Sequence, residues 1–140
     1  MLSYILYQSK RNPICTDEEI TKILHACERN NSHQDITGML IYSDDSFMQI
    51  LEGDYKKIND LYQKIKKDPR HSQIISISLG MLKKRFFPSW AMAHKEVGNE
   101  HLTIISTMAN EEKNKYNDLL SQEASGENSR ALGYFRKVAS

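Results

Sequence analysis

The chain has 140 residues, of which 39% are hydrophobic and 26% are charged. This balance is typical of one globular domain with a single core, and the chain is too short for a two-domain enzyme. Its 19 Lys and Arg residues and 18 Asp and Glu residues leave a net charge of +1, which gives no electrostatic reason to expect nucleic acid or an anionic membrane as the main partner.

The cysteines and the N-terminus indicate the compartment. Cys15 and Cys27 are the only cysteines, so the sequence contains neither a disulfide framework nor a CxxC pair. The N-terminal apolar stretch of about six residues is far below the ~18 needed to span a bilayer, and no charged segment precedes it. We therefore expect a cytoplasmic protein without a signal peptide or a membrane span.

The first half of the chain predicts a strand, a helix and a hairpin. Residues 3–9 place apolar and aromatic side chains at successive positions, as in a strand covered on both faces. Residues 16–30 begin with a capping box (TDEE) and continue with apolar residues at helical spacing. Two apolar runs, 38–42 and 47–51, flank a short polar turn, which predicts a β-hairpin.

The second half repeats the pattern less regularly. Residues 54–65 have helical apolar spacing, and Asp68-Pro69 stops that helix. Residues 74–79 alternate Ile and Ser in the manner of a half-buried strand, and 86–94, around the lone tryptophan, predict a fifth strand. Weak helical signals follow at 116–120 and 132–138.

The order β-α-β-β-α-β-β is that of a ferredoxin-like α+β fold, in which one face of the sheet carries both helices. Strand one presents apolar side chains to both of its sides, so the second face also needs a cover. We expect the C-terminal helices to cap it. The predicted division is a sheet unit at 1–95 and a helical cap at 96–140.

The common catalytic motifs are absent from the sequence. The six glycines form no GxGxxG, Walker A or GxSxG pattern, and the five histidines form no HExxH pair. No metal site is predicted, since no second ligand stands at the required spacing. We therefore expect no catalytic residues and no enzymatic activity.

One polar residue interrupts the apolar third strand. Gln49 lies within Phe-Met-Gln-Ile-Leu, and a buried carboxamide without a partner costs roughly 1–3 kcal/mol. Strands one and three are adjacent in this fold, and the alternation of side chains places Tyr7 on the same face as Gln49. Two interpretations stay open, a simple hydrogen bond in the core or a polar contact to a ligand.

Other polar residues permit the same two interpretations. Asn30 and Asn31 close the first helix, where Asn is a common cap, but two carboxamides there could also bind the edge of a planar heterocycle together with Tyr7 and Gln49. By default, Arg70 and His71 form a solvated turn, and Trp90 and Met92 belong to the core.

Five segments in order resemble BLUF domains, the blue-light sensors using FAD, over residues 2 to about 95. The resemblance rests on Leu6-Tyr7, Arg29-Asn30-Asn31 with Ile36-Thr37-Gly38-Met39-Leu40, Phe47-x-Gln49-x-Leu51-Glu52-Gly53, Asp68-Pro69-Arg70-His71, and Arg85-x-Phe87-x-x-Trp90-x-Met92. It implies FAD between the two helices, although FMN and riboflavin fit the same residues. The residues it implies for binding are Tyr7, Asn30, Asn31, Gln49, Lys64, Arg70, His71 and Met92.

The resemblance also implies a mechanism. Photoexcited flavin would draw an electron and then a proton from Tyr7 through Gln49, and the glutamine would be left rotated or tautomerised when they return. Trp90 and Met92 match positions thought to adjust in response, so the photoactive switch would comprise these four residues. The implied output is signalling to a separate downstream protein, a transcriptional regulator being one kind, and through a homo-oligomer.

Two alternatives share the fold but differ in function. An acylphosphatase-like enzyme would need a phosphate-binding loop with an arginine, and residues 9–12 (SKRN) allow one weakly. An RNA-recognition module would show exposed aromatics on strands one and three and a basic surface, which the net charge of +1 disfavours. A flavin oxidoreductase is disfavoured because no nicotinamide-binding motif is present.

Overall fold

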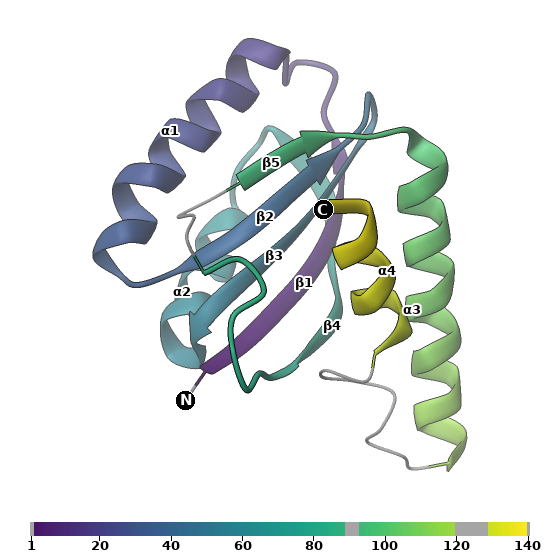
Figure 1. Ribbon diagram of the computed structural model, residues 1–140. Coiled ribbons are helices and arrows are strands. Elements are labelled where there is room, and N and C mark those ends of the chain that lie inside the picture. The colour runs from purple at the N-terminus through teal and green to yellow at the C-terminus, as the bar shows by residue number, and fades with distance from the viewer. Residues whose placement is uncertain (1, 89–92, 120–128, 140) are drawn as a thin grey trace.

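The computed structural model describes residues 2–88, 93–119 and 129–139 (Figure 1). The strands and helices of this part of the chain follow the predicted order. They are β1 (Leu2–Arg11), α1 (Asp17–His33), β2 (Thr37–Tyr42), β3 (Ser46–Asp54), α2 (Tyr55–Ile65), β4 (His71–Met81), β5 (Ala93–Glu96), α3 (Asn99–Leu119) and α4 (Arg130–Ala139).

The five strands form one mixed sheet in the order β4-β1-β3-β2-β5. β1 is antiparallel to both β3 and β4, β3 is antiparallel to β2, and only β5 runs parallel to its neighbour, β2. The predicted ferredoxin-like α+β fold is confirmed, with β1 and β3 side by side in the middle. In their register Tyr7 lies directly opposite Gln49.

Each face of the sheet has its own apolar core, because successive strand residues point to opposite sides. α1 and α2 cover one face, which we call the α1/α2 face, with Ile5, Leu51 and Ile58 among its buried residues. α3 and α4 cover the other, here the α3/α4 face, with Leu6 and Ile50 beneath them (Figure 1). The expected C-terminal cap is therefore present.

α1 begins as its capping box predicts and ends later than expected. The Thr16 hydroxyl accepts a hydrogen bond from the Glu19 backbone N–H at 3.4 Å. The helix then continues to His33, one turn beyond the predicted end near Asn30. Asp35 follows with φ of +57°, a left-handed conformation that Asp tolerates and that lets the chain reverse into β2.

The fifth strand is the main correction to the predicted elements. β5 covers Ala93–Glu96 instead of 86–94, and the backbone N–H groups of Phe86 and Phe87 bind the Glu52 carboxylate at 2.6 and 3.0 Å. These donors are thus engaged by a side chain of β3 rather than by a neighbouring strand. Trp90 and Met92 lie outside the described residues.

The C-terminal helices differ from the sequence prediction mainly in where they begin. α3 starts at Asn99, well before the predicted signal at 116–120, and contacts the sheet through Leu102, Ile105 and Ala109. Its Glu112 carboxylate accepts hydrogen bonds from Ser129 Oγ at 2.7 Å and from the Ala131 N–H at 2.8 Å, which secures the start of α4. No helix within the described ranges is long and apolar enough to cross a membrane.

Candidate functional site

The predicted pair of Tyr7 and Gln49 meets beneath the two N-terminal helices. The Tyr7 hydroxyl donates a short hydrogen bond to Gln49 Oε1, and the two side chains are 4% and 3% exposed. Adjacent antiparallel strands bring them together, because their Cα atoms are partners in the β1–β3 register. The bond leaves the Gln49 Nε2 group as the donor end of a buried amide.

Aromatic rings and low solvent access define the environment of Tyr7. Its ring centroid lies 5.4 Å from that of Tyr62 on α2 and 6.5 Å from that of His71 at the start of β4. Burial raises the Tyr7 pKa well above its ordinary value, and the nearby Cys27, Tyr62 and Asp68 add to the effect. The phenol is therefore held as a neutral hydrogen-bond donor over the whole physiological pH range.

Helical geometry separates the two asparagines at the end of α1. Asn31 is buried, with 2% of its surface exposed, whereas Asn30 is exposed. Consecutive residues of a helix point about 100° apart, so only one of two neighbouring side chains can face the sheet here. The Asn31 carbonyl accepts the Gln34 and Ile36 N–H groups at 3.1 and 2.9 Å, which fixes the turn between α1 and β2.

Arg70 and His71 follow α2 and contact different parts of the molecule. Arg70 pairs with Asp68 at 2.6 Å and with Glu19 of α1 at 3.5 Å, and so ties the segment that follows α2 to α1. The His71 imidazole bonds Ser9 Oγ through Nδ1 at 2.8 Å and the Ile65 carbonyl through Nε2 at 2.7 Å. The His71 ring thus lies beside the Tyr7 ring, whereas the Arg70 side chain is partly exposed at the edge of the α1/α2 face.

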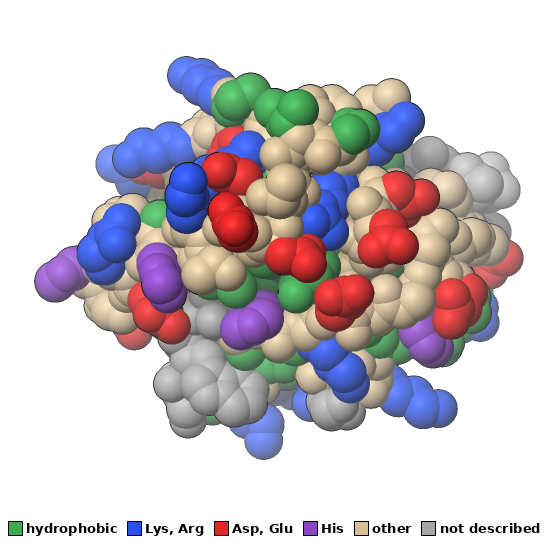
Figure 2. All heavy atoms as spheres, turned by 90° about the horizontal axis from the view of Figure 1, so that it is seen from above, with side chains coloured by type: hydrophobic (Ala, Val, Ile, Leu, Met, Phe, Trp, Pro, Cys, Tyr) green, Lys and Arg blue, Asp and Glu red, His purple; other side chains and the backbone are tan. Residues whose placement is uncertain are grey.

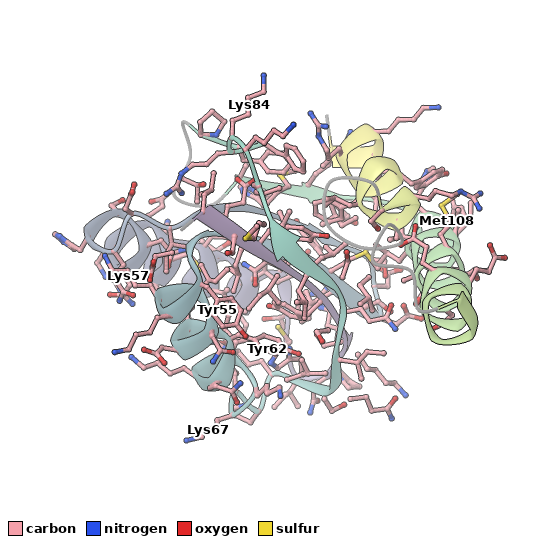
Figure 3. The ribbon with its side chains drawn as sticks, turned by 90° about the horizontal axis from the view of Figure 1, so that it is seen from below. Tyr55, Lys57, Tyr62, Lys67, Lys84 and Met108 are labelled. Atoms are coloured by element: carbon pink, nitrogen blue, oxygen red, sulfur yellow. The ribbon has the colours of Figure 1, made fainter. Side chains whose placement is uncertain are left out.

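Lys64 lies in the last turn of α2 with its side chain exposed. Figure 3 shows two further lysines of this region, Lys57 and Lys67, pointing away from the sheet, whereas Tyr62 faces it. The amphipathic spacing of α2 produces this separation, because Ile58 and Tyr62, four residues apart, both fall on the buried side.

The Arg70–Asp68 ion pair should make the free energy of unfolding depend slightly on pH in the acid range. The hydrogen bonds that the Asp68 carboxylate accepts from Arg70 hold the Asp68 pKa below its ordinary value. Stability from the pair is therefore present above the unfolded-state pKa and is lost as pH falls through the lower folded-state pKa. Arg70→Ala should lower the free energy of unfolding by about 1 kcal/mol or less at neutral pH, because the pair is only partly buried, with 29% and 25% of the two side chains exposed, and water screens it.

Urea unfolding of the Arg70→Ala variant and the unchanged protein, from neutral pH down to about pH 3, measures this difference. The difference in the free energy of unfolding between the two proteins should narrow as Asp68 becomes protonated. Arg29→Ala, which removes an exposed arginine of α1, is the matched control and should show no such narrowing. A gap that widens in acid would contradict the assignment.

Two buried residues, Tyr62 on the α1/α2 face and Glu52 on the opposite face of the sheet, have contacts that were not predicted from the sequence. Tyr62 packs on Tyr7, and its place on the buried side of an amphipathic helix was the available signal. Glu52 is a carboxylate with 0% exposure, and the signal was a charged residue directly after the apolar run of β3. Its partners are the Thr37 hydroxyl of β2 and the backbone N–H groups of Phe86 and Phe87 in a distant loop, and no local spacing reveals them.

The geometry argues against both alternative functions. Residues 9–11 belong to β1, and the Arg11 side chain binds Asp17 and the Cys15 and Ser43 carbonyls, so no phosphate-binding loop forms there. The aromatic residues Tyr4, Tyr7 and Phe47 of β1 and β3 are buried, unlike the exposed stacking platform of an RNA-recognition sheet. The face seen in Figure 2 mixes positive and negative side chains without a basic patch.

Comparisons with known proteins agree with this geometry. The family model described as "BLUF: Sensors of blue-light using FAD" matches residues 2–93. The beta subunit of a photoactivated adenylate cyclase from Euglena gracilis is 30% identical over 92 residues, which are 65% of this chain and 11% of that protein. The blue light- and temperature-regulated antirepressor BluF of Escherichia coli is 34% identical over 80 residues, 55% of this chain and 19% of that protein.

A solved structure covers almost the whole chain. The photo-activated state of BlsA matches with a TM-score of 0.74 and 28% sequence identity, over 99% of this chain and 94% of that one. The two named sequence relatives are much longer, and this chain spans only about a tenth to a fifth of their length. The family match over residues 2–93 includes the strands and helices around Tyr7 and Gln49.

Proposed function

Because the chain belongs to the BLUF family of blue-light flavin sensors, we propose that the Tyr7–Gln49 hydrogen bond is its photoreversible switch. The observation that carries this proposal is the pair itself, a buried phenol donating to a buried amide. Tyrosine can release both an electron and its phenolic proton, and an amide that carries two donors and an acceptor can adopt two hydrogen-bond patterns. The pair can therefore exist in two arrangements without net chemistry.

The two residues have different tasks. The Tyr7 hydroxyl gives its proton toward Gln49 Oε1 and takes it back, and its raised pKa keeps that proton in place in the dark. The Gln49 amide exchanges the positions of its donor and its acceptor. The group that faced Tyr7 in the dark then faces the ligand, and the group that faced the ligand faces Tyr7. His71 and Tyr62 pack against the phenol and keep water from its hydroxyl.

The residues around the pair fit the polar edge of a flavin. That edge carries carbonyl oxygens and ring nitrogens, and a buried Asn31 and the Gln49 amide offer both donors and acceptors. When bound, the flavin supplies the absorption of blue light and a transient electron acceptor. We propose FAD, held by Tyr7, Asn31, Gln49 and His71 together with the more exposed Asn30, Lys64 and Arg70 and with Met92. We further propose Trp90 and Met92 as members of the photoactive switch with Tyr7 and Gln49.

An absorption spectrum tests the proposed function directly. The purified protein, reconstituted with FAD and kept in darkness, should show a flavin spectrum that shifts to the red after blue light and returns in the dark. Extraction and chromatography of the flavin that co-purifies with the protein, before any is added, distinguish FAD from FMN and riboflavin. A protein that takes up none of these flavins would leave Tyr7 and Gln49 as an ordinary core hydrogen bond.

Tyr7→Phe should abolish the red shift while flavin remains bound. The substitution keeps the ring that packs on Tyr62 and removes only the hydroxyl that donates to Gln49. Light-minus-dark absorption spectra measure the loss. Tyr4→Phe is the matched control, because Tyr4 lies on the same strand but under the α3/α4 cover, where its hydroxyl bonds Ser78 at 2.6 Å. An unchanged red shift in Tyr7→Phe would refute the switch.

We propose that the signal passes to a separate protein and that the chain itself catalyses no reaction. The proposed units are the sensor at 1–95 and the cap at 96–140. The support for a regulator of transcription as the partner is the similarity to an antirepressor. Co-purification of the illuminated and the dark protein with a candidate regulator tests this, and equal binding in both states would contradict it.

We also propose that copies of the chain associate with one another. β4 is an edge strand, and its Ile75, Leu79 and Met81 side chains are 46%, 49% and 61% exposed. An edge strand with exposed apolar residues favours pairing with a second chain. Sedimentation of the flavin-loaded protein should show a dimer or a larger species that Leu79→Lys disperses. A monomer at all concentrations would contradict the proposal.

A further inference from the structure

A buried carboxylate links the strand of Gln49 to the loop that follows β4. Glu52 lies three residues after Gln49 on β3 and points to the opposite side of the sheet. Its Oε2 accepts the Phe86 N–H at 2.6 Å, and its Oε1 accepts the Phe87 N–H at 3.0 Å and the Thr37 hydroxyl at 3.2 Å. A carboxylate with 0% exposure and three donors is a charge-assisted anchor.

Arg85 attaches the same loop to the turn after α1. Its guanidinium donates to the Thr37 hydroxyl at 2.9 Å, to the Glu52 carbonyl at 3.1 Å and to the Asp35 carbonyl at 2.7 Å. It also pairs with the Asp35 carboxylate at 3.1 Å. This is the turn whose backbone bonds to the Asn31 carbonyl, so the loop is fastened to both strands and to the end of α1.

The rings of the anchored loop contact α4. The Arg136 Cζ atom lies 3.8 Å from the centroid of the Phe86 ring. The Phe87 and Phe135 rings meet edge to face, with their centroids 6.5 Å apart. Phe87 and Phe135 are 7% and 0% exposed. A continuous series of contacts therefore runs from β3 through the Glu52 carboxylate and the 86–87 backbone to α4.

We propose that Glu52 is a positioning residue of the light response, which holds the 85–87 loop so that a change at Gln49 is transmitted to α4. This inference rests on the proposed function. β3 carries both residues, and a paired strand in the middle of the sheet moves as a unit more readily than it bends. A shift of β3 thus displaces the Phe86 and Phe87 N–H groups, and their rings displace α4.

The test compares Glu52→Gln with the unchanged protein by amide hydrogen exchange in darkness and under blue light. The carboxamide keeps one acceptor oxygen and presents N–H to the other backbone donor, so the Phe86 or the Phe87 amide should exchange roughly 10- to 100-fold faster in both states. The unchanged protein should show a light-minus-dark difference across 130–139, and the variant should lose it. The red shift should persist in the variant.

The control and a second variant keep the outcome clear. Lys84→Gln alters the neighbour of Arg85, and Figure 3 shows Lys84 pointing away from the molecule, so it should retain the difference across 130–139. Arg85→Lys keeps the charge but loses the forked contacts to Asp35 and Thr37, and it serves if Glu52→Gln does not fold. It should also lose the difference.

The possible results separate this inference from the proposed function. No red shift in the unchanged protein would refute the sensor itself. A red shift accompanied by no light-dependent exchange across 130–139 would refute the coupling to α4 and leave the sensor intact. An exchange difference of equal size in Glu52→Gln would refute the role of Glu52, since a merely structural residue changes exchange in darkness and light alike.

Discussion

Gln49→Leu is expected to eliminate the light-induced red shift completely and to leave flavin bound. Leucine has nearly the volume of glutamine but offers no donor or acceptor, so the switch has only one arrangement. The Tyr7 hydroxyl also loses its acceptor at a site with 4% exposure, and an unsatisfied buried donor costs about 1–3 kcal/mol. The variant should therefore be less stable than the unchanged protein.

Absorption spectra before and after blue light measure the photoresponse, and urea unfolding measures the stability. Gln8→Leu is the matched control, since Gln8 is the next residue along β1 after Tyr7 and bonds Ser106 of α3 on the other side of the sheet. The Gln8→Leu variant replaces the same amide with the same apolar side chain, and it should retain the red shift. A Gln49→Leu protein with a normal shift would show that the signal does not pass through this amide.

The Tyr7–Gln49 contact was predictable because its determinants are local and periodic. A strand has a period of two, and antiparallel neighbours place opposite residues on one face. The apolar runs of β1 and β3 therefore sufficed to place the two side chains together. The same alternation puts Ile5 and Leu51 on that face and Leu6 and Ile50 on the other, and the two cores have this division.

The predictions that failed depend on contacts between distant residues. Phe86 and Phe87 have the composition of a strand, but their N–H groups bind Glu52, 34 and 35 residues away. No local pattern reveals which acceptor a backbone donor will find. The site prediction for Asn30 and Asn31 stays a prediction, and the phase of α1 adds that Asn31 is buried and Asn30 exposed.

The start of α3 shows a different difficulty. Leu102, Ile105 and Ala109 stand three and four residues apart and contact the sheet, which is a helical pattern. Thr and Ser residues between them weaken it, and a small residue such as Ala contributes little to an apolar signal. Without α3, the apolar residues on this face of the sheet would be exposed to water. Their need for a cover favours a helix at this point despite its modest helix propensity.

Phe135→Ala is expected to cost about 3–5 kcal/mol in the free energy of unfolding, the range for a buried aromatic truncated to alanine. Phe135 is 0% exposed and packs between α4 and the sheet, with Phe87 at its edge. Its loss leaves a cavity in the core under the cap. That core lies on the far side of the sheet from Tyr7, so the red shift should survive under conditions in which the variant stays folded.

Gly133→Ala is the matched comparison for this change, in the same helix two residues earlier. A methyl group at Gly133 would meet no atom within 4 Å, and alanine in a helix is favoured over glycine by about 0.5–1 kcal/mol. The two substitutions should therefore shift the urea midpoint in opposite directions. If both left it unchanged, α4 would contribute little to the folded state, and the cap would hold the sheet through α3 alone.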